Sequence, residues 1–152
     1  MQGTSRVRDT YVLHMPLSLE DANKVVAGVH AKAAKMGLSV TAAVVDEGGH
    51  LIALGRMDGA PPLSPQIAES KAVGAAMLLR DGGSLQSLAE DRPGFFSAAD
   101  RLVRLPLIPG PGSMPVVRDG LTIGAVGVSG ARPEEDLECC QAGLNSIKLQ
   151  GA

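Results

Sequence analysis

Four cationic side chains are candidates to bind an anionic small molecule. Arg56 stands in a short RMDG turn, Lys71 in an SKA segment, and Arg101 and Arg104 lie three residues apart beside Phe96. Residues at this spacing share one face of a helix, which would form an anion clamp with an aromatic wall. The structural alternative is a local pair between Arg56 and the aspartate two residues later, with the other three cations solvated.

Candidate proton-transfer groups are scattered along the chain. Glu69, Ser113 and His50 are the side chains that we assign to catalysis, with Asp46 as a further polar group. No Ser-His-Asp order and no paired-carboxylate motif connects them, so whether the protein is an enzyme stays open at this point.

A second candidate for anion binding follows the glycine-containing segment GAVGVSG. Ser129 and Gly130 precede a predicted helix, whose first N–H groups could receive an anion. The segment does not open a strand-helix dinucleotide unit, and a strand of small residues that allows close packing is the alternative. Cys139 and Cys140 are adjacent and lack CxxC or HxxxH spacing, so we expect reduced core thiols and no metal site.

Composition restricts the class of protein. The 152 residues carry 14 Lys and Arg against 16 Asp and Glu, a net charge of −2, and 45% of them are hydrophobic. This predicts one globular domain and argues against nucleic acid as a partner. No apolar run approaches the roughly 20 residues that a membrane span needs, and no secretory signal is visible. We therefore expect a cytoplasmic protein without a membrane partner.

The elements that must position these residues follow from periodicity. Apolar residues at steps of three and four predict a helix over 18–36 with Ser18 as its cap, and similar patterns predict helices over 66–80, 84–90, 97–104 and 133–149. Two hairpins are expected, one over 39–56 and one over 114–128 around an Asp-Gly turn. The predicted order is α-β-β-α-α-β-β-α, with a short additional helix over 84–90. Hairpins favour an antiparallel sheet covered by helices, an α+β fold.

Three segments resemble the GlcG/HbpS/PduO C-terminal family of haem-degrading or haem-binding domains. They are VVDEGGHLIALGRMDGA, SKAVGAA, and PVVRDGLTIGAVGVSGA followed by Asp136, and the opening LSLEDANKVVAGVHAKAAKMGL is similar to that family's first helix. The family's GG-x-P-[IV] loop here carries Ser113 as its second residue, and this hydroxyl could contact a bound molecule. Residues 14–152 are thus expected to form one such domain after an extension over 1–13.

The resemblance implies a sheet of about five strands, assembly into a dimer, tetramer or octamer, and a haem-binding or haem-processing function. It also makes His14 the candidate haem ligand, since some family members bind haem through a histidine in this N-terminal region. Two alternatives remain. One is a cofactor-independent lyase or isomerase of a small carboxylated metabolite, either aromatic or aliphatic. The other is a noncatalytic small-acid sensor or partner subunit.

Overall fold

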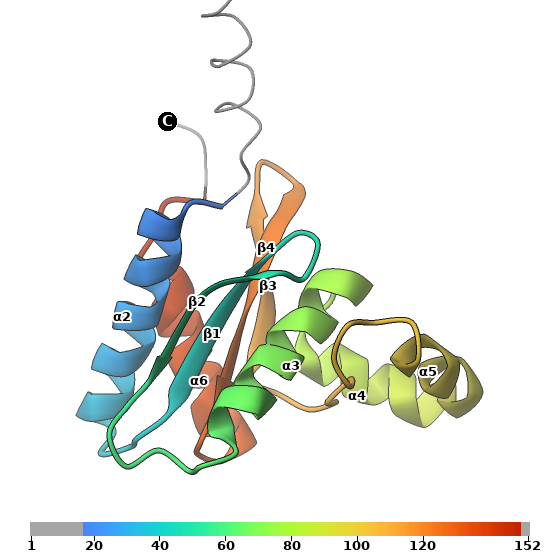
Figure 1. The fold of residues 1–152 in the computed structure, drawn as a ribbon, viewed down its shortest axis with the longest axis horizontal. Coiled ribbons are helices and arrows are strands. Elements are labelled where there is room, and N and C mark those ends of the chain that lie inside the picture. Colours follow the sequence, from blue (N-terminus) through green and yellow to red (C-terminus); the bar gives the residue numbers. More distant parts are fainter. Residues whose placement is uncertain (1–16, 150–152) are drawn as a thin grey trace, which may run out of the picture.

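The computed structural model describes residues 17–149 as a sheet between two helical layers (Figure 1). One layer holds α2 and α6, and the other holds α3, from which α4 and α5 extend away from the sheet. In chain order the elements are α2 (Leu19–Lys35), β1 (Thr41–Asp46), β2 (Leu51–Arg56), α3 (Ser64–Leu78), α4 (Gly82–Asp91), α5 (Pro93–Asp100), β3 (Ser113–Arg118), β4 (Leu121–Ser129) and α6 (Pro133–Leu144).

The sheet is antiparallel throughout, with the strand order β2-β1-β4-β3. Both predicted hairpins form, β1 with β2 and β3 with β4. The two hairpins are joined at the centre of the sheet, where β1 pairs with β4. Asp119 has a φ of 51° and Gly120 a φ of 79°, as the tight turn between β3 and β4 requires. The α+β class is confirmed. The described residues contain four strands, fewer than the five that the resemblance implied.

Helix α2 begins and ends as its sequence predicts. The Ser18 hydroxyl accepts a hydrogen bond from the Asp21 N–H at 3.0 Å, and Gly37 follows the helix with a φ of 71°. The Asp21 carboxylate does not complete a capping box; it pairs with Arg118 at 3.1 Å. The buried stripe of the helix is Ala22, Val25, Val29 and Ala33.

Helix α3 lies against the opposite face of the sheet at very short range. A Cβ placed on Gly127 of β4 would collide with the Ala68 carbonyl and lie 2.7 Å from the Ala72 nitrogen. Only small residues permit this approach, so the alanine-rich sequence of α3 has a packing reason. The prediction of a small-residue helix pressed against the sheet is confirmed.

Two helices have boundaries that differ clearly from those predicted. The helix expected over 97–104 begins at Pro93 and ends at Asp100. It begins earlier because proline suits a first helical turn. It ends earlier because the Asp100 carboxylate accepts the Leu107 N–H at 2.6 Å, and this bond turns the chain away from the helix axis. Helix α6 ends at Leu144, five residues before the predicted end at 149. The first difference decides where the two arginines of the expected clamp lie.

Candidate functional site

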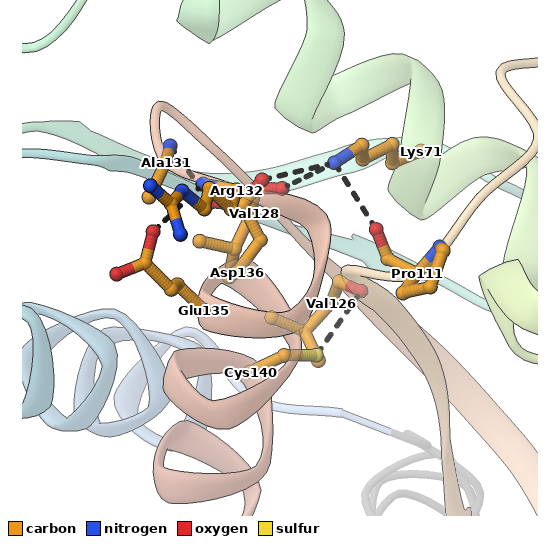
Figure 2. Close-up of polar contacts among 9 residues, drawn as sticks. All are labelled: Lys71, Pro111, Val126, Val128, Ala131, Arg132, Glu135, Asp136 and Cys140. Carbon is orange, nitrogen blue, oxygen red and sulfur yellow. Dashed lines mark hydrogen bonds and ion pairs between the residues drawn. The ribbon is translucent and has the colours of Figure 1, made fainter.

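Lys71 is buried at the junction of α3, β4, α6 and the loop before β3. Its Nζ donates to the Val128 carbonyl at 3.0 Å, to Asp136 Oδ2 at 3.3 Å and to the Pro111 carbonyl at 3.4 Å (Figure 2). The side chains of Lys71 and Asp136 are only 9% and 4% exposed. Three acceptors match the three N–H groups of an ammonium, so Lys71 joins four segments that are far apart in sequence.

The Asp136 carboxylate has two functions at the start of α6. One oxygen pairs with Lys71, and the other accepts the Ala131 N–H at 3.0 Å, which stabilises the start of the helix. Burial raises the pKa of this carboxyl, and the adjacent ammonium of Lys71 opposes that rise. No local pattern in the sequence pairs Asp136 with Lys71, which lies 65 residues earlier in the chain.

The start of α6 is already supplied with negative charge by the chain itself. Ala131 donates to Asp136, and the Arg132 N–H donates to Glu135 Oε1 at 3.1 Å. Ser129 is buried at the end of β4, and Gly130 has a φ of 137°. These two residues, expected to receive an anion, therefore precede N–H groups that the protein's own carboxylates occupy.

Ser113 is fully buried, and its hydroxyl is the one buried side-chain polar atom in residues 17–149 without a hydrogen-bond partner. Its Oγ lies 2.9 Å from the position that a Cβ on Gly82 would take. The hydroxyl thus faces the first turn of α4. It has no solvent exposure in this position, whereas a group that contacts a small molecule must be reachable.

A second polar cluster forms around the turn between β1 and β2. Arg104 Nη2 donates to the Gly49 carbonyl at 2.9 Å and pairs with Glu69 at 3.3 Å. In the same turn, Asp46 Oδ1 accepts the backbone N–H of His50 at 2.9 Å. Three of the four candidate proton-transfer residues therefore gather around this turn. Ser113 instead lies next to the first turn of α4.

The two arginines expected to form one clamp diverge. The helix ends at Asp100, so Arg101 and Arg104 do not extend from a common helical face: Arg104 reaches the β1–β2 turn, while Arg101 is exposed. Phe96 is half-buried in α5. Arg56, also exposed, donates to the Ala60 carbonyl at 2.6 Å, which closes its turn without an ion pair to the neighbouring aspartate.

The cysteines are free and buried in α6. Burial raises the pKa of both thiols, which disfavours the thiolate that metal binding or oxidation requires. Cys140 points to the Val126 carbonyl at 3.8 Å. Within residues 17–149, no group of three or more His, Cys, Asp or Glu is arranged to hold a metal ion, and no helix is long and apolar enough to cross a bilayer.

A haem site would need a free histidine and a hollow that can hold a planar ring. His14 lies outside the described residues. The His30 ring is hydrogen bonded through Nε2 to the Gly55 carbonyl at 2.9 Å, and His50 is exposed. A shallow hollow of about 250 Å³ between α2 and α6 is lined by Lys32, Glu138, Gln141, Ala142 and Asn145. This lining is polar and contains no histidine.

Comparison with known proteins gives a consistent result. A family model described as "Haem degrading protein HbpS-like" matches residues 17–145. Protein GlcG of Escherichia coli strain K12 is 39% identical over 113 residues, which are 74% of this chain and 81% of GlcG.

Solved structures share the fold. A double mutant of HbpS from Streptomyces reticuli superposes with a TM-score of 0.78 at 28% identity, covering 87% of each chain. The PduOC:heme complex superposes with a TM-score of 0.79, covering 88% of this chain and 96% of PduOC. At 23% identity the second comparison supports the fold alone.

Proposed function

This chain belongs to the HbpS-like family of haem-degrading proteins, and from that membership we propose that it binds haem. The observation that carries the proposal is the family match, which extends from residue 17 to residue 145 and includes every described helix and strand. PduOC, which has the same fold, has been crystallised with haem. Haem is therefore the ligand class that these comparisons favour.

The described residues do not by themselves form an enclosed haem pocket. His30 is already hydrogen bonded, His50 stands on an exposed turn, and the hollow between α2 and α6 is polar. A haem pocket needs apolar walls around the macrocycle and an axial ligand directed into it. We therefore limit the proposal to binding and derive no step of haem breakdown.

His14 would hold the haem iron in this proposal, since a neutral imidazole is a common iron ligand. Of the four cations considered for anion binding, Lys71 and Arg104 are engaged by carboxylates and carbonyls of the protein. Arg56 is exposed and uses one N–H for the Ala60 carbonyl, which leaves other guanidinium N–H groups for a propionate. Arg101 is also exposed, so we assign the propionate contact to Arg56 or Arg101.

The test is a titration of the purified full chain with haem, followed by visible absorbance in the Soret region. We expect a saturable shift with a defined ratio of haem to protein. His14→Ala should abolish it, and His50→Ala, which removes an exposed imidazole without a hydrogen bond to its ring, should leave it unchanged. No saturable shift for the wild-type chain would refute haem binding, and an unchanged shift in His14→Ala would refute the assigned ligand.

A second candidate function is proton transfer on a small carboxylated metabolite, and the cluster at the β1–β2 turn favours it. Arg104 holds Glu69 beside the turn that carries Asp46 and His50, so a carboxylate and an imidazole are available near one another. A screen of small carboxylic acids for turnover would test this function. Activity that persists in Glu69→Gln and in His50→Ala would exclude this cluster as its site.

A further inference from the structure

One side of α6 lines the hollow between α2 and α6, which we call the α2–α6 hollow. Glu138, Gln141, Ala142 and Asn145 stand at steps of three and four residues, and Lys32 of α2 completes the lining. Residues at this spacing lie above one another on a helix. Asn145 follows the last residue of α6 but keeps helical φ and ψ angles of −68° and −10°, so it continues the same stripe. Four polar side chains therefore surround the small, half-buried Ala142.

The size of the α2–α6 hollow limits what it can hold. The two helices are in close contact beside it, where a Cβ on Gly28 would lie 3.1 Å from the Gly143 Cα. The space next to Lys32, one turn later in α2, measures about 250 Å³. Sites for drug-sized ligands measure about 300 to 1,000 Å³. The α2–α6 hollow therefore suits a small metabolite and not a macrocycle such as a porphyrin.

One cation and one anion border the α2–α6 hollow without neutralising each other. Within residues 17–149, the Lys32 ammonium and the Glu138 carboxylate form no hydrogen bond and no ion pair. Both charges nevertheless act on one buried thiol. Burial raises the pKa of Cys139, the Glu138 carboxylate raises this pKa further, and the Lys32 ammonium lowers it. The two charges thus lie near each other but too far apart to pair.

Gln141 and Asn145 add neutral polar groups to the same lining. Both residues are exposed, and neither side chain is hydrogen bonded to another residue in the described part of the chain. A primary amide offers two N–H donors and a carbonyl acceptor. The α2–α6 hollow therefore presents one positive charge, one negative charge and two amides, each of them open to a ligand.

We propose that the α2–α6 hollow binds an α-amino acid whose side chain can form hydrogen bonds. An α-amino acid carries an ammonium and a carboxylate on one carbon atom, so it can bridge two opposite charges that do not reach each other. Lys32 holds the carboxylate, Glu138 holds the ammonium, and the two amides contact the ligand's side chain. A simple carboxylic acid is repelled by Glu138, and a simple amine is repelled by Lys32.

The experiment is an NMR titration of the ¹⁵N-labelled full chain with L-glutamine as the probe. We expect saturable changes of the backbone amide shifts, concentrated at Lys32 and at residues 138–145. The midpoint should lie in the millimolar range, because the hollow is open to solvent and the ligand has few atoms. Two glutamine analogues test the charge pairing. One lacks the α-amino group and the other has an amide in place of the α-carboxylate, and each should bind about tenfold more weakly.

Matched variants test the two charges of the protein. Lys32→Met and Glu138→Gln should each raise the dissociation constant for L-glutamine by about tenfold, since each removes one charge-assisted contact. Lys32→Arg keeps the charge and should retain binding. The controls are Lys35→Met in the last turn of α2 and Glu134→Gln in the first turn of α6, which remove exposed charges outside the lining and should change nothing. The amide spectrum of each variant shows whether its fold is intact.

Three results would overturn this proposal. The first is a wild-type chain whose amide shifts around the α2–α6 hollow do not respond to L-glutamine. The second is equal binding of the analogue without the α-amino group, which would make the hollow a simple anion site. The third is a Lys32→Met variant that binds like Lys35→Met. The haem proposal is independent of all three, because Lys32→Met should give the same haem titration as the wild-type chain.

Discussion

Replacement of Lys71 by methionine tests whether the buried ion pair holds the helical layers on the sheet. Methionine keeps most of the length of the lysine side chain and removes its charge. The change deletes three hydrogen bonds, to Val128, Pro111 and Asp136, and leaves the Asp136 carboxylate with the Ala131 N–H as its remaining partner. Removal of one member of a buried pair costs about 3 to 5 kcal/mol, because the other charge stays buried without compensation.

The expected loss is therefore a large share of the total stability. A domain of this size unfolds with a free energy of about 5 to 15 kcal/mol, so the variant should remain folded with a clearly lower denaturation midpoint. Urea denaturation followed by circular dichroism is the suitable assay, since the chain has no tryptophan and one tyrosine. We expect the loss to fall within the range above at neutral pH.

The stability loss of Lys71→Met should also depend on pH, in a direction that the Asp136 pKa determines. Burial raises the pKa of Asp136, so the folded state binds more protons than the unfolded state over an interval above the usual carboxyl value. The contribution of this group to stability is then fully present at acidic pH and is lost as the pH rises through the raised folded value. Without the ammonium of Lys71 the pKa rises further. The deficit of Lys71→Met relative to wild type should grow as the pH increases from about 4 to about 7.

A double variant separates the charge effect from simple loss of packing. When Asp136 is also replaced by leucine, no uncompensated charge remains, and apolar side chains of similar size can fill the site. Lys71→Met with Asp136→Leu should therefore be more stable than Lys71→Met alone. A loss below about 1 kcal/mol in Lys71→Met, the range of an exposed pair, would refute our account of this site. So would a deficit that shrinks as the pH rises.

Two further predictions concern buried polar groups. Ser113→Ala should leave the free energy of unfolding unchanged or raise it by up to about 1 kcal/mol, because it removes a buried hydroxyl that has no hydrogen-bond partner. If urea denaturation shows a loss above about 1 kcal/mol, the hydroxyl is hydrogen bonded in the folded protein. Cys139 and Cys140 should resist a thiol reagent at pH 8 in the native protein and react at once in denaturant, because burial raises both thiol pKa values; fast native labelling would contradict their placement.

Much of the fold could be predicted from local patterns. The spacing of Ala22, Val25, Val29 and Ala33 places one stripe of α2 in the core, and all four are buried. The Asp-Gly turn fixes the β3–β4 hairpin because few other residue pairs adopt its positive φ values. The start of α5 was wrong because Ser97 and Asp100 imitate a cap and first turn, while Pro93 and the bond from Asp100 to the Leu107 N–H determine the real boundaries.

The candidate site was less accessible from the sequence than the fold. Lys71 and Asp136 are 65 residues apart, and nothing local indicates that one neutralises the other. The same limit applies to Arg104, which meets Glu69 and Gly49 across 35 and 55 residues. Spacing placed Arg104 on a helical face with Arg101, but the helix ends before either residue.

The sequence alone determined the elements, the hairpin turns, the α+β class and the family, because each depends on interactions between residues close together in the chain or on an ordered set of motifs. The tertiary structure decided which charges are neutralised inside the protein and which face outward. That distinction depends on burial and on contacts between distant segments: Lys71 is buried between α3, β4 and α6, whereas Arg101 and Leu102 are exposed directly after α5. Only the three-dimensional arrangement could therefore separate a lysine that holds the fold together from an arginine that stays exposed.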